Sequence, residues 1–360
     1  QAKSVCLFEK HSNKSDDERL IQKYEKEGVY VVVNPFDRSY SGEDLDNIYL
    51  LPFERKPHPK YVKRGTVPAF EMIKYSVNIH RGCFGGCAFC TIAAHQGKRI
   101  ISRSRKSILR EIEIISKDKD FKGYLSDLGG PSANMYMMKG RNDELCRKCT
   151  RPSCLYPVLC KNMNNDHRPL LELYEAVRKL PYIKKAFVGS GIRYDLFDKS
   201  DYFEVLCRHH VSGRLKVAPE HSSDRVLEQM RKMPFSQFVD LNKRFEKINR
   251  KYGLNQQLIP YFISSHPACD MRDMVDLASQ TAALGYRLQQ VQDFTPTPMT
   301  IATETYYTEM DIYTGEKVFT EKNPAAKQMQ NRIFFWYKPE NRNWARNVFK
   351  KYGKQFPRQG

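Results

Sequence analysis

Six short β-prone runs alternate with helical patterns along the chain, and no other feature limits the fold as strongly. The runs are SVNIH (76–80), KGYLSD (122–127), KKAFVGS (184–190), RLKVA (214–218), QQLIPYFIS (256–264) and RLQQVQDF (287–294). Between them lie helical patterns at 107–118, 170–180, 202–209, 222–232 with 235–252, and 272–285. Strands that alternate with helices build parallel βαβ units. The pattern predicts an α/β fold, and six units predict a partial (β/α)6 barrel of the TIM type.

The loops that follow these runs carry residues that packing alone does not require. The first loop holds three cysteines, and the next five are LGGPSANMY (128–136), GSGIRYD (189–195), PEHSSD (219–224), SHPACD (265–270) and TPTPMT (295–300). Turn formation accounts for some of their Gly, Pro, Ser and Asp residues. It does not account for Cys, Arg, Glu and His in loops that all lie at the carboxyl ends of parallel strands. We expect one large site at that rim.

The first loop, HRGCFGGCAFC (80–90), places Cys83, Cys87 and Cys90 close together. A structural zinc site normally closes a tetrahedron with four ligands, whereas three cysteines hold three corners of a 4Fe–4S cube and leave one iron open. The open iron can be chelated by the amino and carboxylate groups of a small molecule and can pass it an electron. A zinc knuckle completed by His80 or His95 is the alternative.

A second cysteine group lies in LCRKCTRPSCLYPVLCKN, between the second run and its helix. Its members are Cys146, Cys149, Cys154 and Cys160. The segment is too short and too rich in proline and charge to bury a core, so we expect metal to hold it. Four thiols suit zinc or a second 4Fe–4S cluster, and the spacing does not separate the two. Because the insertion (141–168) begins at the rim of the first cluster, we favour the auxiliary cluster.

Charge and composition restrict the partners and the compartment. Sixty Lys and Arg against 41 Asp and Glu give a net charge of +19, which favours anionic partners such as RNA. Ten cysteines indicate metal or redox chemistry if the thiols stay reduced, as they do in the cytoplasm. No apolar run is long enough to span a membrane, and QAKSVCLFEK lacks the features of a secretory signal. We therefore expect a cytoplasmic protein with no membrane partner.

The pattern divides the chain into three parts. Residues 1–74 form an N-terminal segment, which the initial Gln suggests is the remnant of a larger region. Residues 75–310 form the barrel with its insertion, and residues 311–360 form a basic, aromatic C-terminal extension. Interleaved aromatic and basic residues suit stacking on bases. They equally suit packing against the barrel through Phe334, Phe335 and Trp336.

The cysteine loop resembles the signature of radical S-adenosylmethionine enzymes, which is C-x3-C-x2-C with an aromatic residue before the last cysteine. More narrowly, the chain resembles the YgiQ family from about residue 29 to its end. The motifs are IKYSVNIHRGCFGGCAFCTIAAHQGKRIISRS, DLGGPSANMY, CTRPSCLYPVLCKN, VAPEHSSDRVLEQMRK, PYFISSHPACD, FTPTPMT and YKPENRNWARN. Members of that family are usually longer at the N-terminus, and the family's substrate is not established.

The resemblance implies how S-adenosylmethionine would be held. The three cysteines of the first loop would bind the cluster, and Phe89 would pack near the adenine. Gly129 and Gly130 stand where the superfamily has Gly-Gly-Glu, so their backbone carbonyls would hold the methionine amino group. Pro131 replaces the usual acid, so the role of that acid is not carried over.

The later loops would complete the same site. By resemblance, Ser190 and Arg193 would hold the methionine carboxylate, which suits a bidentate guanidinium. Glu220 and Ser222 would meet the ribose hydroxyls or the methionine. Cys269, beside His266, lies on the proposed rim and is a candidate for radical quenching, transient bonding to substrate or hydrogen donation; packing at a helix entry is its other interpretation. We interpret Asp195 and Asp224 as helix N-caps.

The chemistry implied by the resemblance is reductive cleavage of S-adenosylmethionine. A donor such as flavodoxin or ferredoxin reduces the cluster, and the resulting 5′-deoxyadenosyl radical abstracts hydrogen from an unactivated C–H position. The favoured substrate is RNA, ribosomal or otherwise, or another large anionic molecule, with methyl or sulfur transfer as candidate outcomes. Two alternatives stay open: a modifier of a small molecule or peptide, and a non-catalytic RNA- or ribosome-binding protein whose metals only staple loops.

Overall fold

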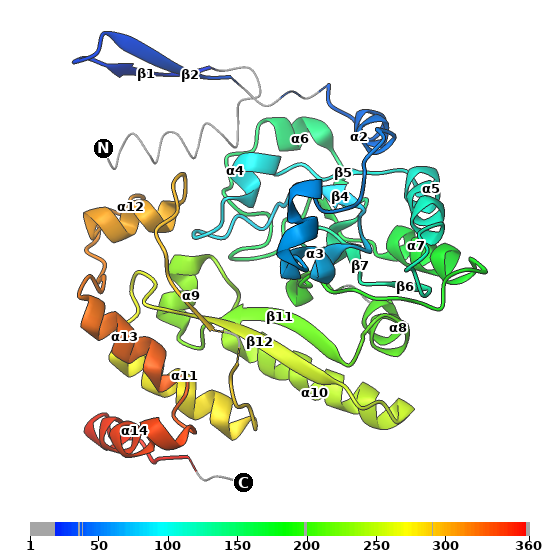
Figure 1. The fold of residues 1–360 in the computed structure, drawn as a ribbon. Helices are drawn as coiled ribbons and strands as arrows, with labels where there is room; N and C mark the ends of the chain where they lie inside the picture. Colours follow the sequence, from blue (N-terminus) through cyan, green and yellow to red (C-terminus); the bar gives the residue numbers. More distant parts are fainter. Residues whose placement is uncertain (1–18, 35–36, 38, 198–199, 290, 358–360) are drawn as a thin grey trace.

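The computed structural model describes residues 19–34, 37, 39–197, 200–289 and 291–357. A row of parallel strands forms its centre (Figure 1). These strands are β3 (Ser76–Asn78), β6 (Tyr124–Leu125), β7 (Asp127–Gly129), β10 (Lys185–Ala186), β11 (Arg214–Glu220), β12 (Gln257–Ser264) and β13 (Val291–Asp293). Each lies within or beside one of the six predicted runs.

The strands are joined to one another in chain order. β3 pairs with β7, β6 with β10, β11 with β12 and β12 with β13, all parallel. A parallel bridge between Ile192 and Val217 links the segment after β10 to β11. Within the part of the chain that the structure describes, no pairing joins β3 to β13, so the row does not close into a barrel. The prediction of an α/β fold is confirmed.

Helices connect successive strands of this row. They are α5 (Arg105–Ser116), α7 (Arg168–Arg178), α8 (Tyr202–His209), α9 (Asp224–Met230), α10 (Phe235–Tyr252) and α11 (Met271–Ala283). Local chemistry sets several of their ends. Asp270 and Asp273 form a capping box at the start of α11, and Gly253, in the left-handed conformation, ends α10.

Apolar faces of the helices and strands share one large core. Phe238 of α10 lies edge-on to Phe262 of β12, with the ring centroids 6.4 Å apart. The helix α12 (Ile301–Thr308) follows the last strand, and the C-terminal extension joins this core through α13 (Pro324–Ile333) and α14 (Pro339–Lys351). Phe334, Trp336 and Phe349 are buried in it, so these rings pack within the protein and do not face solvent.

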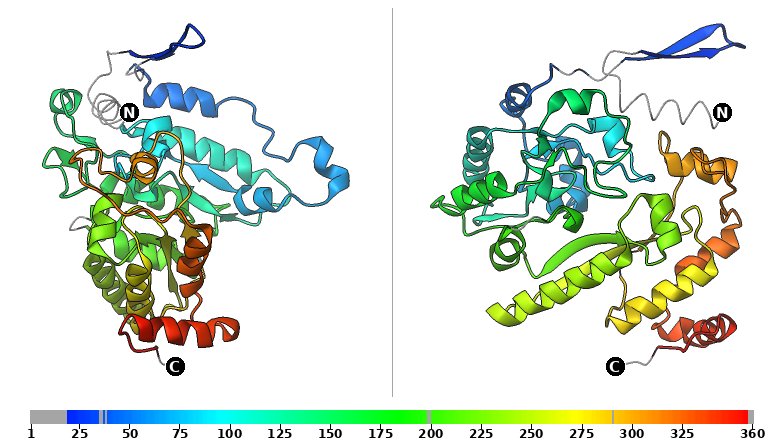
Figure 2. Two further views of the ribbon diagram at one scale, coloured as in Figure 1. Left: turned by 90° about the vertical axis from the view of Figure 1, so that its left-hand side faces the viewer. Right: turned by 180° about the vertical axis from the view of Figure 1, so that it is seen from behind.

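Shorter elements lie around the row. They are the hairpin β1 (Leu20–Tyr24) and β2 (Val29–Val33), α2 (Gly42–Tyr49), η1 (Pro59–Arg64), α3 (Pro68–Ile73), β4 (His80–Arg81), α4 (Ile92–Gln96), β5 (Ile101–Ser102), η2 (Ala133–Met135), β8 (Lys139–Gly140), α6 (Asp143–Arg147), β9 (Met163–Asn164) and η3 (Tyr194–Leu196). The hairpin projects from one edge of the molecule in both views of Figure 2. Across the described residues, we find no helix whose length and apolar character would carry it through a bilayer.

Candidate functional site

The first cysteine loop runs from β4 to α4 and is folded tightly by two glycines. Gly82 and Gly86 have φ values of 88° and 60°, which L side chains rarely adopt. A Cβ at Gly86 would lie 2.1 Å from the carbonyl oxygen of Pro152, so the loop approaches another segment too closely for any other residue. Cys83 is buried, and Cys87 and Cys90 are half-buried.

The thiols of this loop accept hydrogen bonds from nitrogen donors. The Gly85 N–H donates to Cys83 Sγ at 3.4 Å, and Arg193 Nη1 donates to Cys87 Sγ at 3.2 Å. Burial raises the pKa of Cys83 and raises the pKa of Cys90 to about 11. Without metal these two thiols are therefore protonated, whereas a bound metal would deprotonate them.

The donor set fits an iron–sulfur cluster. Three free thiols occupy one loop, and hydrogen bonds to cluster sulfurs are one of the means by which proteins tune such clusters. Within the described residues, no three His, Cys, Asp or Glu side chains converge closely enough to hold a single metal ion.

Gly129, the last residue of β7, and Gly130, which follows it, lie against the third loop and β4. A Cβ at Gly130 would lie 2.6 Å from Cε1 of His80, and a Cβ at Gly129 would lie 2.6 Å from Oγ of Ser190. The Gly129 carbonyl accepts the Ile79 N–H at 2.8 Å. Glycine is thus required at both positions by close approach, which brings the loop backbone to the rim.

Ser190, predicted to bind the methionine carboxylate, is held by a neighbouring acid. Its hydroxyl donates to the carboxylate of Asp127, which also accepts the backbone N–H groups of Gly189 and Ser190 at 2.8 and 3.1 Å. Asp127 therefore fixes the third loop to the second strand. The sequence reasoning did not identify this residue.

Arg193 is buried and forms a bidentate pair with Asp195. Nε donates to Oδ1 at 2.9 Å and Nη2 donates to Oδ2 at 2.5 Å. Burial alone raises the pKa of Asp195, but the guanidinium holds it below its usual value. Burial alone lowers the pKa of Arg193, but Asp195 and the Cys87 thiol hold it well above its usual value. The capping prediction for Asp195 is wrong, because Arg193 occupies the N-cap of η3 and the Asp195 carboxylate is the buried counter-ion of Arg193.

A second buried pair lies at the end of β11, where a register shift between Val217 and Glu220 redirects the chain. Glu220 has a φ of 69°, and its Oε1 lies 3.7 Å from Nζ of Lys232, which also donates to the Ala218 carbonyl at 2.7 Å. Burial raises the pKa of Glu220, and Lys232 opposes that shift. Among the described residues, Oε2 of Glu220 and Oγ of Ser222 are buried without a hydrogen-bond partner.

The neighbouring prediction for Asp224 is also wrong. Ser223 occupies the N-cap of α9, and Asp224 lies in the first helical turn, where its charge favours the helix dipole.

The loop after β12 is closely packed. The His266 ring contacts those of Phe89 and Phe294, with centroids 6.0 and 5.0 Å apart, and burial lowers the pKa of His266 to about 4. Cys269 is fully buried, with Sγ 3.5 Å from Nε2 of His221 and 3.5 Å from Oε1 of Gln330. The Cys269 thiol thus lies behind the loop surface, and its catalytic role stays a prediction.

The second cysteine group is carried by the insertion that the antiparallel pair β8–β9 closes at its base. Cys146, at the end of α6, is exposed and accepts a hydrogen bond from Asn162 Nδ2 at 3.2 Å. Arg151 donates its N–H to Cys149 Sγ at 3.4 Å, and the Cys160 N–H donates to the Cys154 carbonyl at 2.8 Å. Burial raises the pKa of Cys154 to about 11.

The insertion packs directly on the first cysteine loop. The Cys154 N–H donates to the Phe84 carbonyl at 3.0 Å, and Ser153 Oγ donates to the Gly85 carbonyl at 2.6 Å. A small buried cluster, separate from the main core, lies beneath both loops and includes Phe84, Leu155 and Met163. The two predicted metal sites are therefore neighbours.

Lys232 is the second residue that the sequence reasoning missed. It follows Arg231, which ends α9 in the left-handed conformation with a φ of 56°. Glycine is the usual residue in that conformation, and because arginine stands there, the sequence does not indicate the turn. Of the isolated cysteines, Cys207 is buried in the core, and Cys6 lies outside the described residues.

Family models match both ends of the chain. Residues 1–76 match a family described as "Radical SAM N-terminal", and residues 289–356 match "Domain of unknown function (DUF3362)". A UPF0313 protein of Bacteroides thetaiotaomicron is 55% identical over 99% of this chain and 58% of its own length. A UPF0313 protein of Porphyromonas gingivalis is 52% identical over 98% of this chain and 57% of its own length. The chain thus spans little more than half the length of these relatives.

Likeness to solved structures is weaker. The radical S-adenosylmethionine methyltransferase TsrM from Kitasatospora setae, with cobalamin and a 4Fe–4S cluster bound, has a TM-score of 0.45 and 14% identity, over 69% of this chain and 41% of that chain. Methylornithine synthase (PylB) has a TM-score of 0.42 and 10% identity, over 81% of this chain and 76% of that chain.

Proposed function

The chain belongs to the UPF0313 (YgiQ) family of the radical S-adenosylmethionine superfamily, as its motifs predicted, and from this membership we propose that it cleaves S-adenosylmethionine reductively. The 5′-deoxyadenosyl radical then modifies an unactivated C–H position of RNA or another large anionic substrate. Since the chain spans 58% of the first relative, the activity of the whole protein is part of this proposal.

One contact carries the proposal. Arg193, assigned to the methionine carboxylate, donates to Sγ of Cys87, assigned to the cluster, at 3.2 Å, although 106 positions separate them in sequence. In the proposed site, a molecule that chelates the open iron through its amino and carboxylate groups would meet a guanidinium beside that iron. In this proposal Phe89, Gly129, Gly130 and Ser190 would line the same site.

In the proposed mechanism Cys83, Cys87 and Cys90 would hold the cluster, which would supply an electron for cleavage of the carbon–sulfur bond. The protein supplies fixed charges. Arg193 and Lys232 are buried cations, paired with Asp195 and Glu220, and Oε2 of Glu220 would be an acceptor for an ammonium or ribose hydroxyl group. A cationic group beside Glu220 would favour its ionised form against the effect of burial. Oγ of Ser222, which has no hydrogen-bond partner among the described residues, would be a second polar atom at this site.

The second cysteine group would hold an auxiliary 4Fe–4S cluster, with zinc as the competing occupant. Its hydrogen bonds to the Phe84 and Gly85 carbonyls support a role next to the first cluster. The alternative, a structural staple, would use the same four thiols, and metal analysis separates the two.

The proposal extends to architecture and partners. The chain would comprise an N-terminal segment (1–74), a partial (β/α)6 barrel (75–310) with the insertion at 141–168, and a C-terminal extension (311–360). The chain-order pairing from β3 to β13 supports the barrel.

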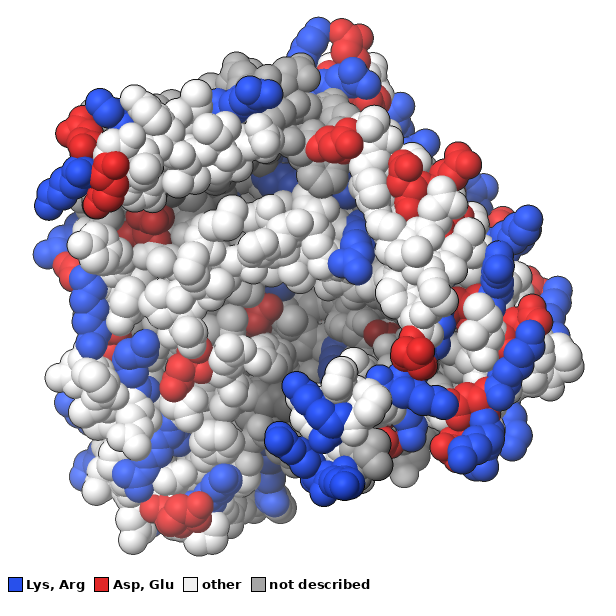
Figure 3. Space-filling model, turned by 45° about the horizontal axis from the view of Figure 1, so that its top comes forward, with Lys and Arg blue, Asp and Glu red and all other residues white. Residues whose placement is uncertain are grey.

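The enzyme would work in the cytoplasm with flavodoxin or ferredoxin as electron donor. The hollow face in Figure 3, with Lys and Arg side chains gathered along part of its rim, supports an anionic substrate, and methyl or sulfur transfer is the candidate outcome.

Metal content and product formation test the proposal together. Iron, acid-labile sulfide and zinc are measured in anaerobically purified protein and in a variant that combines Cys83→Ala, Cys87→Ala and Cys90→Ala. We expect the variant to lose one cube and the parent alone to form 5′-deoxyadenosine after reduction. A parent that holds only zinc and never cleaves S-adenosylmethionine after reconstitution would instead be a metal-stapled binding protein.

A further inference from the structure

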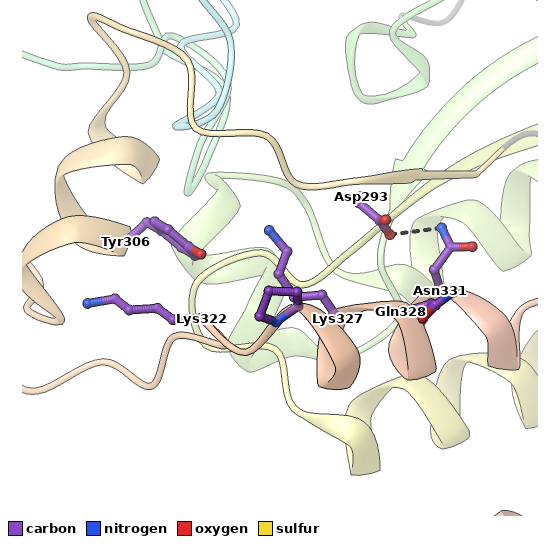
Figure 4. Close-up of a pocket in the computed structure, with 7 residues that line it drawn as sticks. Asp293, Tyr306, Lys322, Lys327, Gln328 and Asn331 are labelled. Atoms are coloured by element: carbon purple, nitrogen blue, oxygen red, sulfur yellow. Dashed lines mark hydrogen bonds between the residues drawn. The ribbon is translucent and has the colours of Figure 1, made fainter.

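A pocket of about 430 Å³ lies where the carboxyl end of β13 meets the C-terminal extension (Figure 4). Its polar and aromatic lining residues are Asp293, Tyr306, Lys322, Lys327, Gln328 and Asn331. A volume between about 300 and 1,000 Å³ is typical of sites for small organic ligands. Neither the cysteine loops nor the residues assigned to S-adenosylmethionine line it.

A row of aromatic rings connects this pocket to the cysteine loop. Phe89 contacts His266, His266 contacts Phe294, and Phe294 contacts Tyr306, with centroids 6.0, 5.0 and 5.6 Å apart. Asp293, on the opposite side of the pocket from Tyr306 in Figure 4, accepts a hydrogen bond from Ser264 at the end of β12. The pocket therefore lies beside the carboxyl ends of β12 and β13, and these rings connect it to the loop that carries Phe89.

The pocket offers a cation, a carboxylate and a flat ring. Lys327 Nζ lies 5.3 Å from the centroid of the Tyr306 ring and donates to the Phe294 carbonyl at 3.3 Å. In the described part of the chain it forms no ion pair, whereas Lys322 pairs with Glu309 at 2.6 Å. Asp293 accepts from Asn331 Nδ2 at 2.8 Å, which leaves it further acceptor capacity.

We propose that this pocket binds a nucleotide unit of the substrate. Its phosphate meets the free charge of Lys327, its base stacks on Tyr306, and a base or ribose donor reaches Asp293. This inference rests on the proposed function, for which it names the substrate class and its location. The net charge of +19 fits a polyanion, and a free nucleotide offers the same chemistry.

Calorimetric titration of the full-length, cluster-loaded protein tests the pocket without catalysis. S-adenosylmethionine is present at saturation and no reductant is added, so that a nucleoside cannot occupy the adenosyl site. The probes are UMP, uridine, ribose 5-phosphate and a uridine tetranucleotide. We expect UMP to bind at least about tenfold more tightly than uridine, which lacks the phosphate, or ribose 5-phosphate, which lacks the base.

Two variants test, by mutant cycles, whether Lys327 binds the phosphate and Tyr306 the base. Lys327→Gln lowers UMP affinity by about tenfold and leaves uridine unchanged, since only the phosphate uses that charge. Tyr306→Leu lowers UMP affinity by about tenfold and leaves ribose 5-phosphate unchanged. Lys350→Gln, at an exposed position of α14, is the matched control and changes nothing. Thermal melting confirms that each variant is folded.

The titrations have opposed outcomes. Tighter binding of the tetranucleotide than of UMP supports RNA as the source, and equal binding supports a free nucleotide. The proposal is overturned if UMP binds no better than ribose 5-phosphate, or if Lys327→Gln behaves like Lys350→Gln. Formation of 5′-deoxyadenosine by the same preparation after reduction tests the proposed cleavage of S-adenosylmethionine independently of the binding result.

Discussion

The two cysteine groups differ in how the protein holds them. The first lies between β4 and α4, and the buried Arg193–Asp195 pair lies directly behind it. The second lies on an insertion whose helix α6 carries two exposed ion pairs between neighbouring turns, Arg147–Asp143 and Lys148–Glu144. Exposed pairs contribute little to stability, whereas breaking a buried pair leaves an uncompensated charge. The α/β core therefore shapes the first site, whereas the insertion packs on the first loop and, in our proposal, would also depend on a bound metal.

Metal removal should separate the two groups most strongly. We expect amide exchange in residues 141–162 to accelerate by at least about 100-fold in the apoprotein, because metal binding contributes about 10 kcal/mol or more in modules that metal holds together. Exchange in β11 and β12 should stay slow. Hydrogen exchange with mass spectrometry checks this, and equal acceleration in both regions would refute the contrast.

Asp195→Ala tests the buried pair. We expect the free energy of unfolding to fall by about 3 kcal/mol, because Arg193 keeps a buried charge without its partner. Arg193 lowers the pKa of Asp195 in the folded protein. The stabilisation that the pair gives is therefore fully present above about pH 4, and it is lost as the pH falls through the pKa of Asp195 in the folded protein.

Urea denaturation at several pH values measures this effect. Asp143→Ala, which breaks the exposed Arg147–Asp143 pair, is the control and should change the free energy by no more than about 0.5 kcal/mol. Equal losses in both variants would mean that Arg193 is solvated.

Gly86→Ala tests the contact between the loops. A Cβ there would meet the Pro152 carbonyl in a backbone with positive φ, so we expect a loss of about 2 kcal/mol and faster proteolysis of the insertion. Gly191→Ala, where no atom of the described residues lies within 4 Å of the added atom, should be close to neutral. A neutral Gly86→Ala would show that the two loops can separate freely.

Ser153→Ala should have the smallest effect. The variant removes the hydrogen bond to the Gly85 carbonyl and the acceptor for the N–H groups of Leu155 and Tyr156. We expect a loss of about 1 kcal/mol in chemical denaturation. Ser116→Ala, on the exposed end of α5, provides the baseline, and a loss no greater than that baseline would mean that water replaces these bonds.

The regular elements could be predicted because their patterns are local. The predicted helices at 202–209 and 235–252 coincide with α8 and α10, whose apolar residues recur at helical spacing. The predicted strand at 122–127 is instead divided into β6 and β7, which pair with different neighbours, β10 and β3. The residues of a short run do not indicate which distant strand the run pairs with.

The sequence by itself determined the α/β pattern, the two cysteine groups and the family, because each is written in spacing along the chain. Only the tertiary structure decided that the backbone N–H of Cys154 donates a hydrogen bond to the Phe84 carbonyl. It also decided that Lys232 lies beside Glu220 and that Cys269 is buried. Those facts depend on which segments meet when the core forms and on how much water they exclude. A carboxylate such as Asp195 has the same local sequence whether it caps an exposed helix or neutralises a buried guanidinium, and burial selects between the two.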